Sequence, residues 1–499
     1  MSSFDDPANR AIFPASDQAM TQPTARAKPG APPIHEQIYA RFRAMIEQGQ
    51  LSPGQKVSSL RALATELGVA RGTVQVAYDR LLGEGYLVAR GPAGTFVSEH
   101  TAPAQPARAK QAAVVAPPLP AEGAPDNIIE VDGGSPAPFQ MGLPALDEFP
   151  RKLWAGLMAR QVRKAGSLTK PAPAGYMPLR EALAAYLHRS RGIDADAGQV
   201  FIVPAYTASL ALTVDALGLA RESAWVEHPG YPPTAQTLKR LGLPVCDVSV
   251  DQHGINVAFG RAHFPNARLA VVTPSHQSPT GVALPLQRRV ELLDWAGERD
   301  AWIVEDDYDG EYRYRGHPLP ALKSMDSGGR VIYCGTLSKV LFPGLRLSYV
   351  VVAQSLVPQF ELACRRTAHG GCPELLQAAV AEFISEGHFS RHIKRMRTLY
   401  ARRRALLAEA LAPYAAEGFV VHLQDGGMHL LVDVRDDLDD VVLASRARNA
   451  GFAVHALTTW RNGAPGRRGL LMGFTNVRDR DEAERLVAEL IRSFELQAG

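Results

Sequence analysis

The sequence predicts a multidomain protein in which a small helical module precedes a large α/β body. Residues 34–99 carry three helical patterns followed by two short strand patterns. From residue 175 onward, apolar strand runs alternate with helical patterns, which is typical of a largely parallel sheet covered by helices. Between the two, residues 101–125 contain six prolines and many alanines, which is the composition of a linker. We therefore expect a polar arm over residues 1–30, a module over 31–99, a linker over 100–127 and a body over 128–499.

Composition excludes several classes of protein. The chain has 499 residues, and its 54 Lys and Arg against 51 Asp and Glu give a net charge of +3. This balance excludes a globally basic nucleic-acid coat and an acidic disordered protein, but it allows a small DNA-binding module. No apolar run approaches the ~20 residues of a membrane helix, and no secretory signal is visible. The scattered cysteines (Cys246, Cys334, Cys364 and Cys372) lack metal-ligand spacing, so we expect reduced thiols, no metal and a cytoplasmic location.

The N-terminal module has the pattern of a helix-turn-helix. The first helix is expected to end near Gly49, and Ser58 and Ser59 are placed to cap the second, which Gly68 closes. The apolar positions are Ile38, Phe42, Met45 and Ile46 in the first helix, Leu63 and Leu67 in the second, and Val74, Ala77, Tyr78 and Leu81 in the third. Two helices joined by a short turn containing glycine form the helix-turn-helix motif.

Polar residues of the third helix are candidates for DNA contacts. Arg71, Thr73 and Gln75 lie outside its apolar stripe and near its N-terminus, where a recognition helix meets bases and phosphates. Strand patterns at 86–90 and 95–98, joined by Gly91-Pro92-Ala93-Gly94, predict a wing-like hairpin. The alternative is a plain three-helix core with solvated arginines, because basic and acidic residues nearly balance in this segment.

In the body, polar segments follow the predicted strands. Strands are expected at 224–226, 269–273, 302–304 and 331–334, and Leu286, Val290 and Leu293 predict an amphipathic helix between two of them. The segments after the strands are Glu227-His228-Pro229-Gly230-Tyr231, residues 274–281, Glu305-Asp306-Asp307-Tyr308 and Gly335-Thr336-Leu337-Ser338-Lys339. Ligands of such sheets bind at the carboxyl ends of the strands, so we expect the site there.

This set of residues suits pyridoxal phosphate. Lys339 offers the amine for an imine, and Asp306 offers a carboxylate for the protonated ring nitrogen. If the strand continues, Asp306 and Tyr308 project to one face and Asp307 points away. Further candidates are Thr336, Ser338 and Arg346 for the phosphate and Tyr231 for stacking on the ring. Each residue alone is a weak signal, because such residues are usually surface, cap or turn residues.

Residues 32–97 resemble the winged helix-turn-helix of GntR-type regulators almost from end to end. The matching words are EQIY, LSPG, Arg61-Ala62-Leu63-Ala64, LGVARGTVQVAY, EGYL and GTFV. The resemblance implies that Arg61, Arg71 and Thr73 contact operator DNA and that the wing, with Gly94 and Thr95, approaches the minor groove or the backbone. Ala70 stands where the family usually has a serine, which removes an N-cap or a phosphate-bonding hydroxyl.

Residues 139–499 resemble a fold-type I, aspartate aminotransferase-like domain, in the version that MocR/GabR-type regulators fuse to a GntR-type module. The matching words include EHPGY, TPSHQSPTG, VEDDYDGEYRY, PLPAL, VIYCGTLSK and LFPGLRLSY. The resemblance implies that Lys339 is the Schiff-base lysine, Asp306 the partner of the pyridine nitrogen and Tyr308 the partner of the phenolic oxygen. It also implies that Arg346 contacts the phosphate or an effector carboxylate.

Three departures from the family pattern bear on the body. The phosphate cup Ser-Gly-x-Gln reads Pro204-Ala205-Tyr206-Thr207, in which Pro lacks an N–H, Ala adopts positive φ less freely than Gly, and Thr207 offers a hydroxyl. An arginine often found two residues after the stacking tyrosine is Pro233. The pattern Arg-x-x-Phe, whose arginine holds a substrate carboxylate, reads Leu471-Met472-Gly473-Phe474. Arg467 and Arg468 lie nearby in sequence and are candidates to replace that arginine.

Three functions follow as hypotheses. The first is a homodimeric regulator that binds operator DNA and senses pyridoxal phosphate itself or an amino compound condensed with it. The second is a working aminotransferase with a DNA-binding appendage, against which the missing carboxylate arginine argues. The third is a relic fold kept for dimerisation. The basic run at 391–397 is expected to form a solvated or inter-subunit helix face, with a supplementary DNA contact as the alternative.

Overall fold

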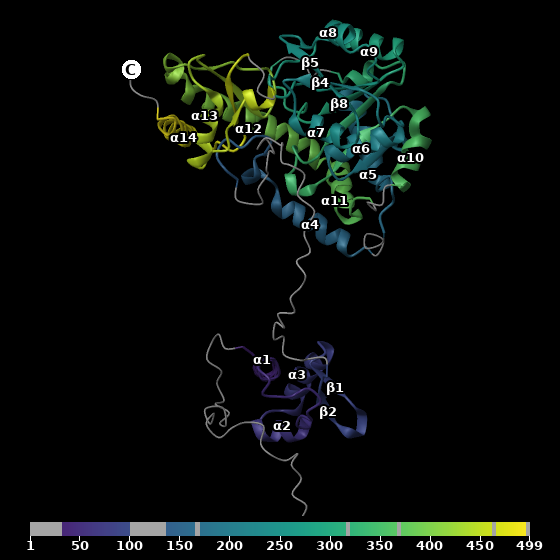
Figure 1. Ribbon diagram of the computed structural model, residues 1–499, viewed down its shortest axis with the longest axis vertical. Coiled ribbons are helices and arrows are strands. Elements are labelled where there is room, and N and C mark those ends of the chain that lie inside the picture. The colour runs from purple at the N-terminus through teal and green to yellow at the C-terminus, as the bar shows by residue number, and fades with distance from the viewer. Residues whose placement is uncertain are drawn as a thin grey trace, which may run out of the picture. The chain divides into compact units, whose positions relative to one another are not determined.

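The computed structural model describes residues 32–99, 136–164, 170–315, 320–366, 371–461 and 466–495. The chain divides into two compact units, Met1–Ala121 and Glu122–Gly499 (Figure 1). The expected arm (1–30) and linker (100–127) lie outside the described residues. Among the described residues no helix is long and apolar enough to cross a membrane, and no cluster of metal-ligating side chains is found.

The N-terminal unit is a winged helix-turn-helix, as predicted. Its elements are α1 (Ile34–Glu47), α2 (Leu60–Leu67), α3 (Arg71–Gly83), β1 (Leu87–Ala89) and β2 (Thr95–Val97). The Ser59 side chain caps α2 by accepting a hydrogen bond from the Ala62 amide (3.3 Å), and Gly68 ends the helix at φ +63°. The predicted apolar stripes meet in one core, in which Phe42, Leu63 and Tyr78 are buried. The antiparallel hairpin is slightly shorter than predicted.

The body is built on an eight-stranded sheet of order β3-β10-β9-β8-β7-β4-β5-β6. The strands are β3 (Val200–Val203), β4 (Ala224–His228), β5 (Val245–Asp251), β6 (Gly254–Ile255), β7 (Leu269–Val272), β8 (Trp302–Asp307), β9 (Val331–Thr336) and β10 (Ser348–Val351). Strands β4, β5, β7, β8 and β9 are mutually parallel, β10 is antiparallel to both of its neighbours, and β6 is antiparallel to β5. The sheet is therefore largely parallel, as the sequence predicts.

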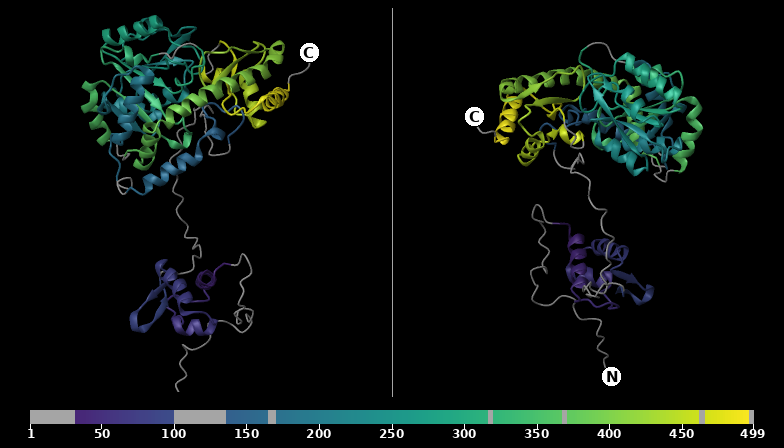
Figure 2. Two further views of the ribbon diagram at one scale, coloured as in Figure 1. Left: turned by 180° about the vertical axis from the view of Figure 1, so that it is seen from behind. Right: turned by 45° about the horizontal axis from the view of Figure 1, so that its top comes forward.

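Helices cover both faces of this sheet (Figures 1 and 2). The helices α6 (Tyr206–Ala216), α7 (Pro232–Arg240) and α10 (Val357–Arg366) pack on one face. On the other face pack α5 (Met177–Arg191), α8 (Val257–His263), α9 (Leu286–Glu298) and α11 (Glu374–Ser385), together with α4 (Arg151–Val162). Successive strand residues alternate between these cores, so that Val304 of β8 faces the first and Ile303 the second.

The buried face of α9 differs from the prediction. The helix exists, but Leu286 and Val290 of the predicted apolar stripe are 67% and 43% exposed. The buried face instead carries Leu292, Trp295 and Ala296. Trp295 stacks on Trp225 with ring centroids 4.0 Å apart, so aromatic packing against the sheet decides the orientation of the helix.

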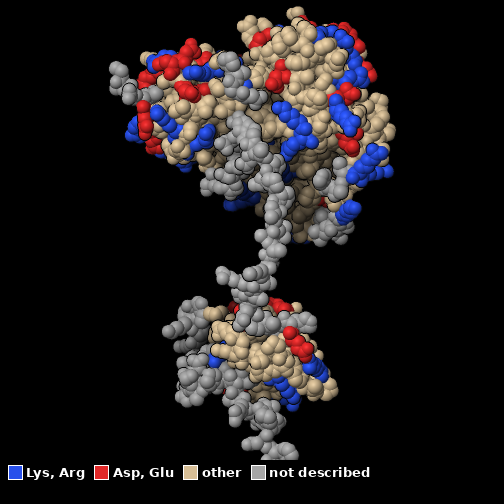
Figure 3. All heavy atoms as spheres, in the orientation of Figure 1, with Lys and Arg blue, Asp and Glu red and all other residues tan. Residues whose placement is uncertain are grey.

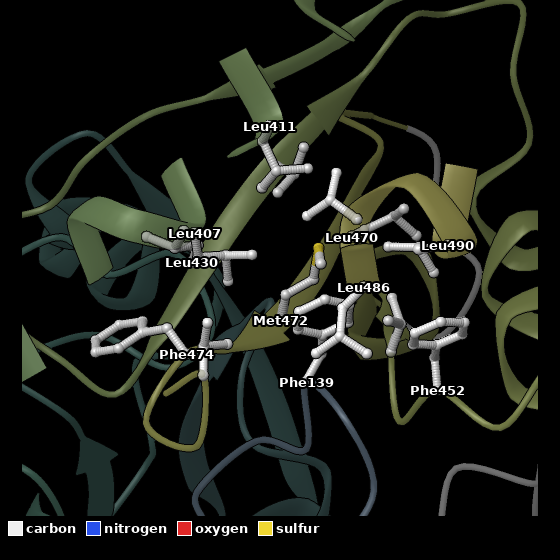
Figure 4. Close-up of a cluster of buried hydrophobic side chains, with 14 of the residues drawn as sticks. Phe139, Leu407, Leu411, Leu430, Phe452, Leu470, Met472, Phe474, Leu486 and Leu490 are labelled. Atoms are coloured by element: carbon white, nitrogen blue, oxygen red, sulfur yellow. The ribbon is translucent and has the colours of Figure 1, made fainter. Parts of the chain in front are cut away.

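The C-terminal part of the body, here called the C-terminal lobe, has its own antiparallel sheet of order β11-β12-β14-β13. Its elements are β11 (Phe419–Val421), β12 (His429–Val434), α13 (Asp440–Asn449), β13 (His455–Ala456), β14 (Gly469–Gly473) and α14 (Arg480–Ser493). Leucine side chains of these elements, with Phe139, Phe452 and Phe474 from the segments beside them, fill its core (Figure 4). The long helix α12 (His388–Leu411) contributes Phe389 to the core of the large sheet and Leu407 to this one, and thereby joins the two parts.

Candidate cofactor site and DNA-contact surface

The chemistry-bearing residues of the body meet at one edge of the large sheet. Because β4, β7, β8 and β9 are parallel, their carboxyl ends lie at the same edge. Three of these strands continue past their predicted ends, β4 to His228, β8 to Asp307 and β9 to Thr336. Asp306 is therefore a strand residue held in register by the sheet, and Lys339 follows β9 by three residues.

The Lys339 amine lies against the backbone of residue 142. Its Nζ donates a hydrogen bond to the Gly142 carbonyl oxygen over 3.0 Å. Gly142 has φ +65°, and a Cβ at this position would lie 2.2 Å from Nζ, so the close approach requires glycine. Burial lowers the pKa of Lys339, while the carboxylates of Asp309 and Asp306 act in the opposite direction. Burial thus favours the neutral amine, which is the nucleophilic form needed for imine formation.

Asp306 and Asp307 face opposite sides of the sheet. The Asp307 carboxylate lies 2.8 Å from Arg191 Nε of α5 and accepts a hydrogen bond from the Tyr333 hydroxyl (2.7 Å). Asp306 is only 7% exposed, and its side chain makes no hydrogen bond within the described part of the chain. Burial, with the nearby charges of Asp307 and Glu227, raises the pKa of Asp306 well above its ordinary value. A buried carboxyl without a donor calls for a cationic N–H partner, and the protonated ring nitrogen of pyridoxal phosphate fits that need.

Two tyrosines border Asp306. The Tyr308 hydroxyl lies 2.9 Å from His276 Nδ1, and the charge of Asp306 contributes to a raised pKa of Tyr308, after burial and Asp309. Burial and then Asp306 raise the pKa of Tyr231 to about 12. The Tyr231 ring is 5.9 Å from that of Trp460 and 6.1 Å from that of Tyr206. The structure thus brings Asp306, Tyr308, Tyr231 and Lys339 into one neighbourhood.

The residues predicted to contact the phosphate differ in whether their side chains are already hydrogen-bonded within the chain. Arg346 is exposed, at φ +50°, and neither its guanidinium nor the Ser338 hydroxyl has a hydrogen-bond partner among the described residues. The Thr336 hydroxyl is engaged, since it accepts from the Ser338 amide (3.3 Å) and pairs with the Ser348 hydroxyl (3.1 Å). Arg346 and Ser338 therefore remain available to bind an anion.

The altered phosphate cup lies at the start of α6. Ala205 is extended (φ −167°) and its side chain gives no cap, whereas a glycine here would be free to adopt positive φ. Thr207 lies in the first turn of α6 and lines a groove with Pro204, Thr237 and Arg240. On this side the cofactor fit depends on Arg346, Ser338 and the free amides of α6.

Sequence reasoning missed four buried residues of the site: Glu227, His276, Ser278 and Asp309. Their segments stand out as polar runs after strands, but nothing in the pattern marks which side chain faces inward. Glu227 accepts hydrogen bonds from the Thr273 amide (3.2 Å) and hydroxyl (2.5 Å). Burial raises the pKa of Glu227 to about 7 despite these hydrogen bonds. The Ser278 side chain bonds to Tyr308.

An apolar cluster occupies the position at which the family pattern has a carboxylate-binding arginine. Leu471 is fully buried on β14, opposite Leu431 of β12, and packs with Leu457 and Trp460. Met141, which precedes the Gly142 that accepts the hydrogen bond from Lys339, and Tyr231, the predicted stacking residue, pack against this cluster. We call these six residues the apolar wall.

The two nearby arginines do not substitute for the missing one. Arg467 Nε lies 2.6 Å from Asp433 Oδ1. Arg468 donates to the carbonyl oxygens of Asp436 (2.8 Å) and Leu438 (2.9 Å). Both guanidinium groups are thus satisfied within the C-terminal lobe.

The predicted DNA-contact residues lie on the surface of the N-terminal unit. Arg61 and Arg71 are exposed, and Thr73 and Gln75 are half-buried in α3, where Gln75 donates to Asp79 (2.6 Å). Gly94 and Thr95, also half-buried, begin the second strand of the wing. As the Ala70 substitution predicts, α3 has no side-chain cap. The sequence did not single out Lys56, whose Cε would lie 2.9 Å from a Cβ at Gly94, so that this lysine lies under the wing.

The Arg and Lys residues of the run at 391–397 lie on the exposed side of α12, whereas His392, Ile393 and Met396 are buried. Arg391 donates to the Glu386 carbonyl oxygen (3.1 Å) and contacts His388, and Arg395 pairs with Glu148. Figure 3 shows Lys and Arg interspersed with Asp and Glu over the drawn face of the body. These contacts fit the expected solvated face.

Two family models match the two units. Residues 34–97 match the family "Bacterial regulatory proteins, gntR family", and residues 158–462 match "Aminotransferase class I and II". Solved structures agree with the second. Pyrococcus horikoshii kynurenine aminotransferase superposes with a TM-score of 0.64 at 27% identity, over 73% of this chain and 93% of that one. LysN, an α-aminoadipate aminotransferase from Thermus thermophilus, gives 0.64 at 27%, over 72% and 92%.

A winged helix-turn-helix joined to this body defines a DNA-binding transcriptional regulator with an aminotransferase-like, pyridoxal-phosphate domain. The chain is 35% identical to the probable rhizopine catabolism regulatory protein MocR of Rhizobium meliloti, over 89% of this chain and 90% of the relative. It is 32% identical to the pyridoxine biosynthesis regulator PdxR of Corynebacterium glutamicum, over 92% and 95%. The chain belongs to the MocR-type family of regulators, and its cofactor is pyridoxal phosphate.

Proposed function

We propose that the body senses pyridoxal phosphate, or an amine condensed with it, and thereby changes how the winged helix-turn-helix binds its operator. Pyridoxal phosphate supplies an aldehyde that condenses with amines. Lys339 offers the amine, Asp306 holds the ring nitrogen, Tyr308 faces the phenolic oxygen, Tyr231 stacks on the ring, and Arg346 with Ser338 binds the phosphate. The observation that carries the proposal is the Lys339 amine, whose pKa is lowered by burial, in the neighbourhood of the Asp306 carboxyl, which has no hydrogen-bond partner among the described residues.

The apolar wall supports sensing over turnover. An α-amino acid needs its carboxylate fixed by a guanidinium for its reacting bonds to be aligned. Leu471 and Trp460 offer no such group, and Arg467 and Arg468 are bound elsewhere. A carboxylate placed against these side chains would be desolvated without a partner, which disfavours binding. The wall therefore favours the cofactor itself, or amines without an α-carboxylate, as the effector.

The regulator acts on DNA as a homodimer. Two recognition helices related by a two-fold axis match two operator half-sites, and a symmetric body is a natural source of that axis. Because it binds chromosomal DNA, we place the protein in the cytoplasm. The names of two relatives mention rhizopine catabolism and pyridoxine biosynthesis. They are compatible with a small amine or the cofactor as the signal.

Footprinting of the DNA upstream of the protein's own gene tests the proposal. The footprint is expected to change when pyridoxal phosphate or a carboxylate-free amine is added. Lys339→Ala should abolish that change while leaving the ligand-free footprint in place. Arg71→Ala should weaken the footprint about tenfold or more, the usual cost of one recognition contact. A wild-type footprint that no ligand alters, with the cofactor demonstrably bound, contradicts sensing.

The second candidate, a working aminotransferase, has its own test. Multi-turnover release of a keto acid from an amino donor by the wild type would favour it. Under the sensing proposal, Leu471→Arg should gain amino-acid binding that the wild type lacks, because the new guanidinium supplies the missing partner. Leu431→Arg, which exchanges the cross-strand neighbour, is the control for burying a charge in the same wall.

A further inference from the structure

A buried polar cluster links Tyr308 to the C-terminal lobe. His276, in the segment after β7, is 5% exposed. Its Nδ1 lies 2.9 Å from the Tyr308 hydroxyl and 3.2 Å from Asp309 Oδ2, whose side chain is 1% exposed. One ring nitrogen thus contacts a phenol and a carboxylate at the same time.

The carboxylate decides where the proton lies. Among the described residues the buried Asp309 Oδ2 accepts no hydrogen bond, and it faces His276 Nδ1 at 3.2 Å. Nδ1 must therefore carry a hydrogen, because a lone pair facing Asp309 would be repelled. With that hydrogen on Nδ1, the Tyr308 oxygen is an acceptor toward His276. The phenol's own proton is then free to be donated away from His276, on the side of Asp306 and Lys339.

The C-terminal lobe covers the other side of the same imidazole. Gly427, at φ +92° before β12, comes so close that a Cβ there would lie 2.1 Å from His276 Cε1. The His429 ring lies 5.4 Å from that of His276, and its Nε2 donates to the Pro279 carbonyl oxygen over 3.0 Å. A small cavity lined by His276, Asp309, Gly426 and Gly427 adjoins the contact. Any shift of the lobe therefore meets His276 directly.

We propose that His276 is a positioning residue that turns the Tyr308 phenol into a hydrogen-bond donor toward the cofactor and makes that donation depend on how the C-terminal lobe is seated. The inference rests on the proposed binding of pyridoxal phosphate at Lys339. The occupancy of the site and the seating of the lobe are then coupled through one imidazole, because each constrains the same ring.

The test measures the pH midpoint of the long-wavelength absorption of the bound cofactor in the full-length protein. A phenol that donates to the cofactor oxygen stabilises its anionic form, so loss of the donation raises the midpoint. His276→Gln, whose amide cannot reach the Nδ1 position, should raise the midpoint by about one pH unit, a tenfold change in the ionisation constant. His276→Asn, whose amide nitrogen replaces Nδ1, should restore it.

A double-mutant cycle separates positioning from bulk structure. Tyr308→Phe should raise the midpoint by itself, and adding His276→Gln to it should raise the midpoint no further. Additive shifts would show that His276 acts independently of the phenol and would overturn the proposal. The charged and titratable groups around the pair are Asp306, Asp309, Glu227, Lys339, His429, Arg191 and Arg313, and they are unchanged across the cycle.

A second experiment changes a residue of the C-terminal lobe and leaves His276 in place. Gly427→Ala should raise the midpoint because its methyl group displaces the imidazole. Gly451→Ala is the matched control, since it has the same backbone strain (φ +90°) in the same lobe but meets nothing within 4 Å. Equal midpoints for the two variants would overturn the coupling to the lobe. Ligand-dependent footprinting is a separate measurement, so failure of sensing is distinguishable from failure of this inference.

Discussion

Gly142→Ala tests the placement of the Lys339 amine. The new methyl carbon would lie 2.2 Å from Nζ and 3.1 Å from Cε, whereas ordinary contact begins at 3.4 Å, so Nζ must retreat by about 1.2 Å. A misplacement of this size typically costs about 100-fold where reacting atoms must be aligned. We therefore expect the apparent affinity for pyridoxal phosphate to fall by about that factor. Absorbance titration of the cofactor-free protein measures it.

Gly218→Ala is the control for this experiment. It imposes the same left-handed backbone on alanine (φ +64° against +65°) but meets no atom within 4 Å. Both variants should lose about 1 kcal/mol of unfolding free energy from that conformation, while only Gly142→Ala should lose cofactor affinity. Equal affinities in the two variants would refute the argument that the amine lies against residue 142.

Three further predictions concern stability and DNA binding. Arg191→Met leaves the buried Asp307 carboxylate without its guanidinium and should lower the unfolding free energy by about 3 to 5 kcal/mol in urea titrations; a loss below about 1 kcal/mol would contradict the ion-pair argument. Burial, with His276 nearby, lowers the pKa of His429 to about 4, so this residue costs stability as the pH falls from about 6.5 toward 4. His429→Gln keeps the donor to Pro279. Its unfolding free energy should exceed that of the wild type by about 2 to 3 kcal/mol at pH 4.5 and equal it at pH 7. Parallel curves of unfolding free energy against pH for the two proteins would contradict this prediction. Ala70→Ser supplies the missing cap of α3. It should stabilise that unit by about 1 kcal/mol in thermal melts and tighten the footprint. An unchanged melting temperature would show that the serine hydroxyl does not reach the Thr73 amide.

The sequence predicts the fold well where periodicity is strong and poorly where packing decides. The three helices of the winged unit follow from apolar spacing and caps, because a short helix must bury a single stripe. In α9 two stripes compete, and the Trp225–Trp295 stack selects the one that spacing alone did not favour. Strand ends were underestimated, because acidic residues such as Glu227 and Asp306 look like loop residues until the sheet around them is known.

The candidate site was predictable in its outline but not in its supporting residues. Motif words predict Lys339 and Asp306 as cofactor residues, since an imine needs an amine and a protonated ring nitrogen needs a carboxylate. They do not identify His276 or the role of Gly427, because that contact joins segments about 150 residues apart in the chain. The raised pKa of the Asp306 carboxyl likewise depends on its burial in the tertiary structure, which the local sequence does not reveal.

The strand that carries Asp306 also separates two carboxylates that are adjacent in the chain. Their side chains lie on opposite sides of one peptide layer, yet the charge of Asp307 contributes to the raised pKa of Asp306. In the proposed site, where Asp306 holds the ring nitrogen, Arg191 of helix α5 would act on the pyridine ring from the other side of the sheet, since its guanidinium offsets the charge of Asp307. Substitutions in α5 would therefore let relatives with identical cofactor contacts differ in how strongly they stabilise the protonated ring nitrogen.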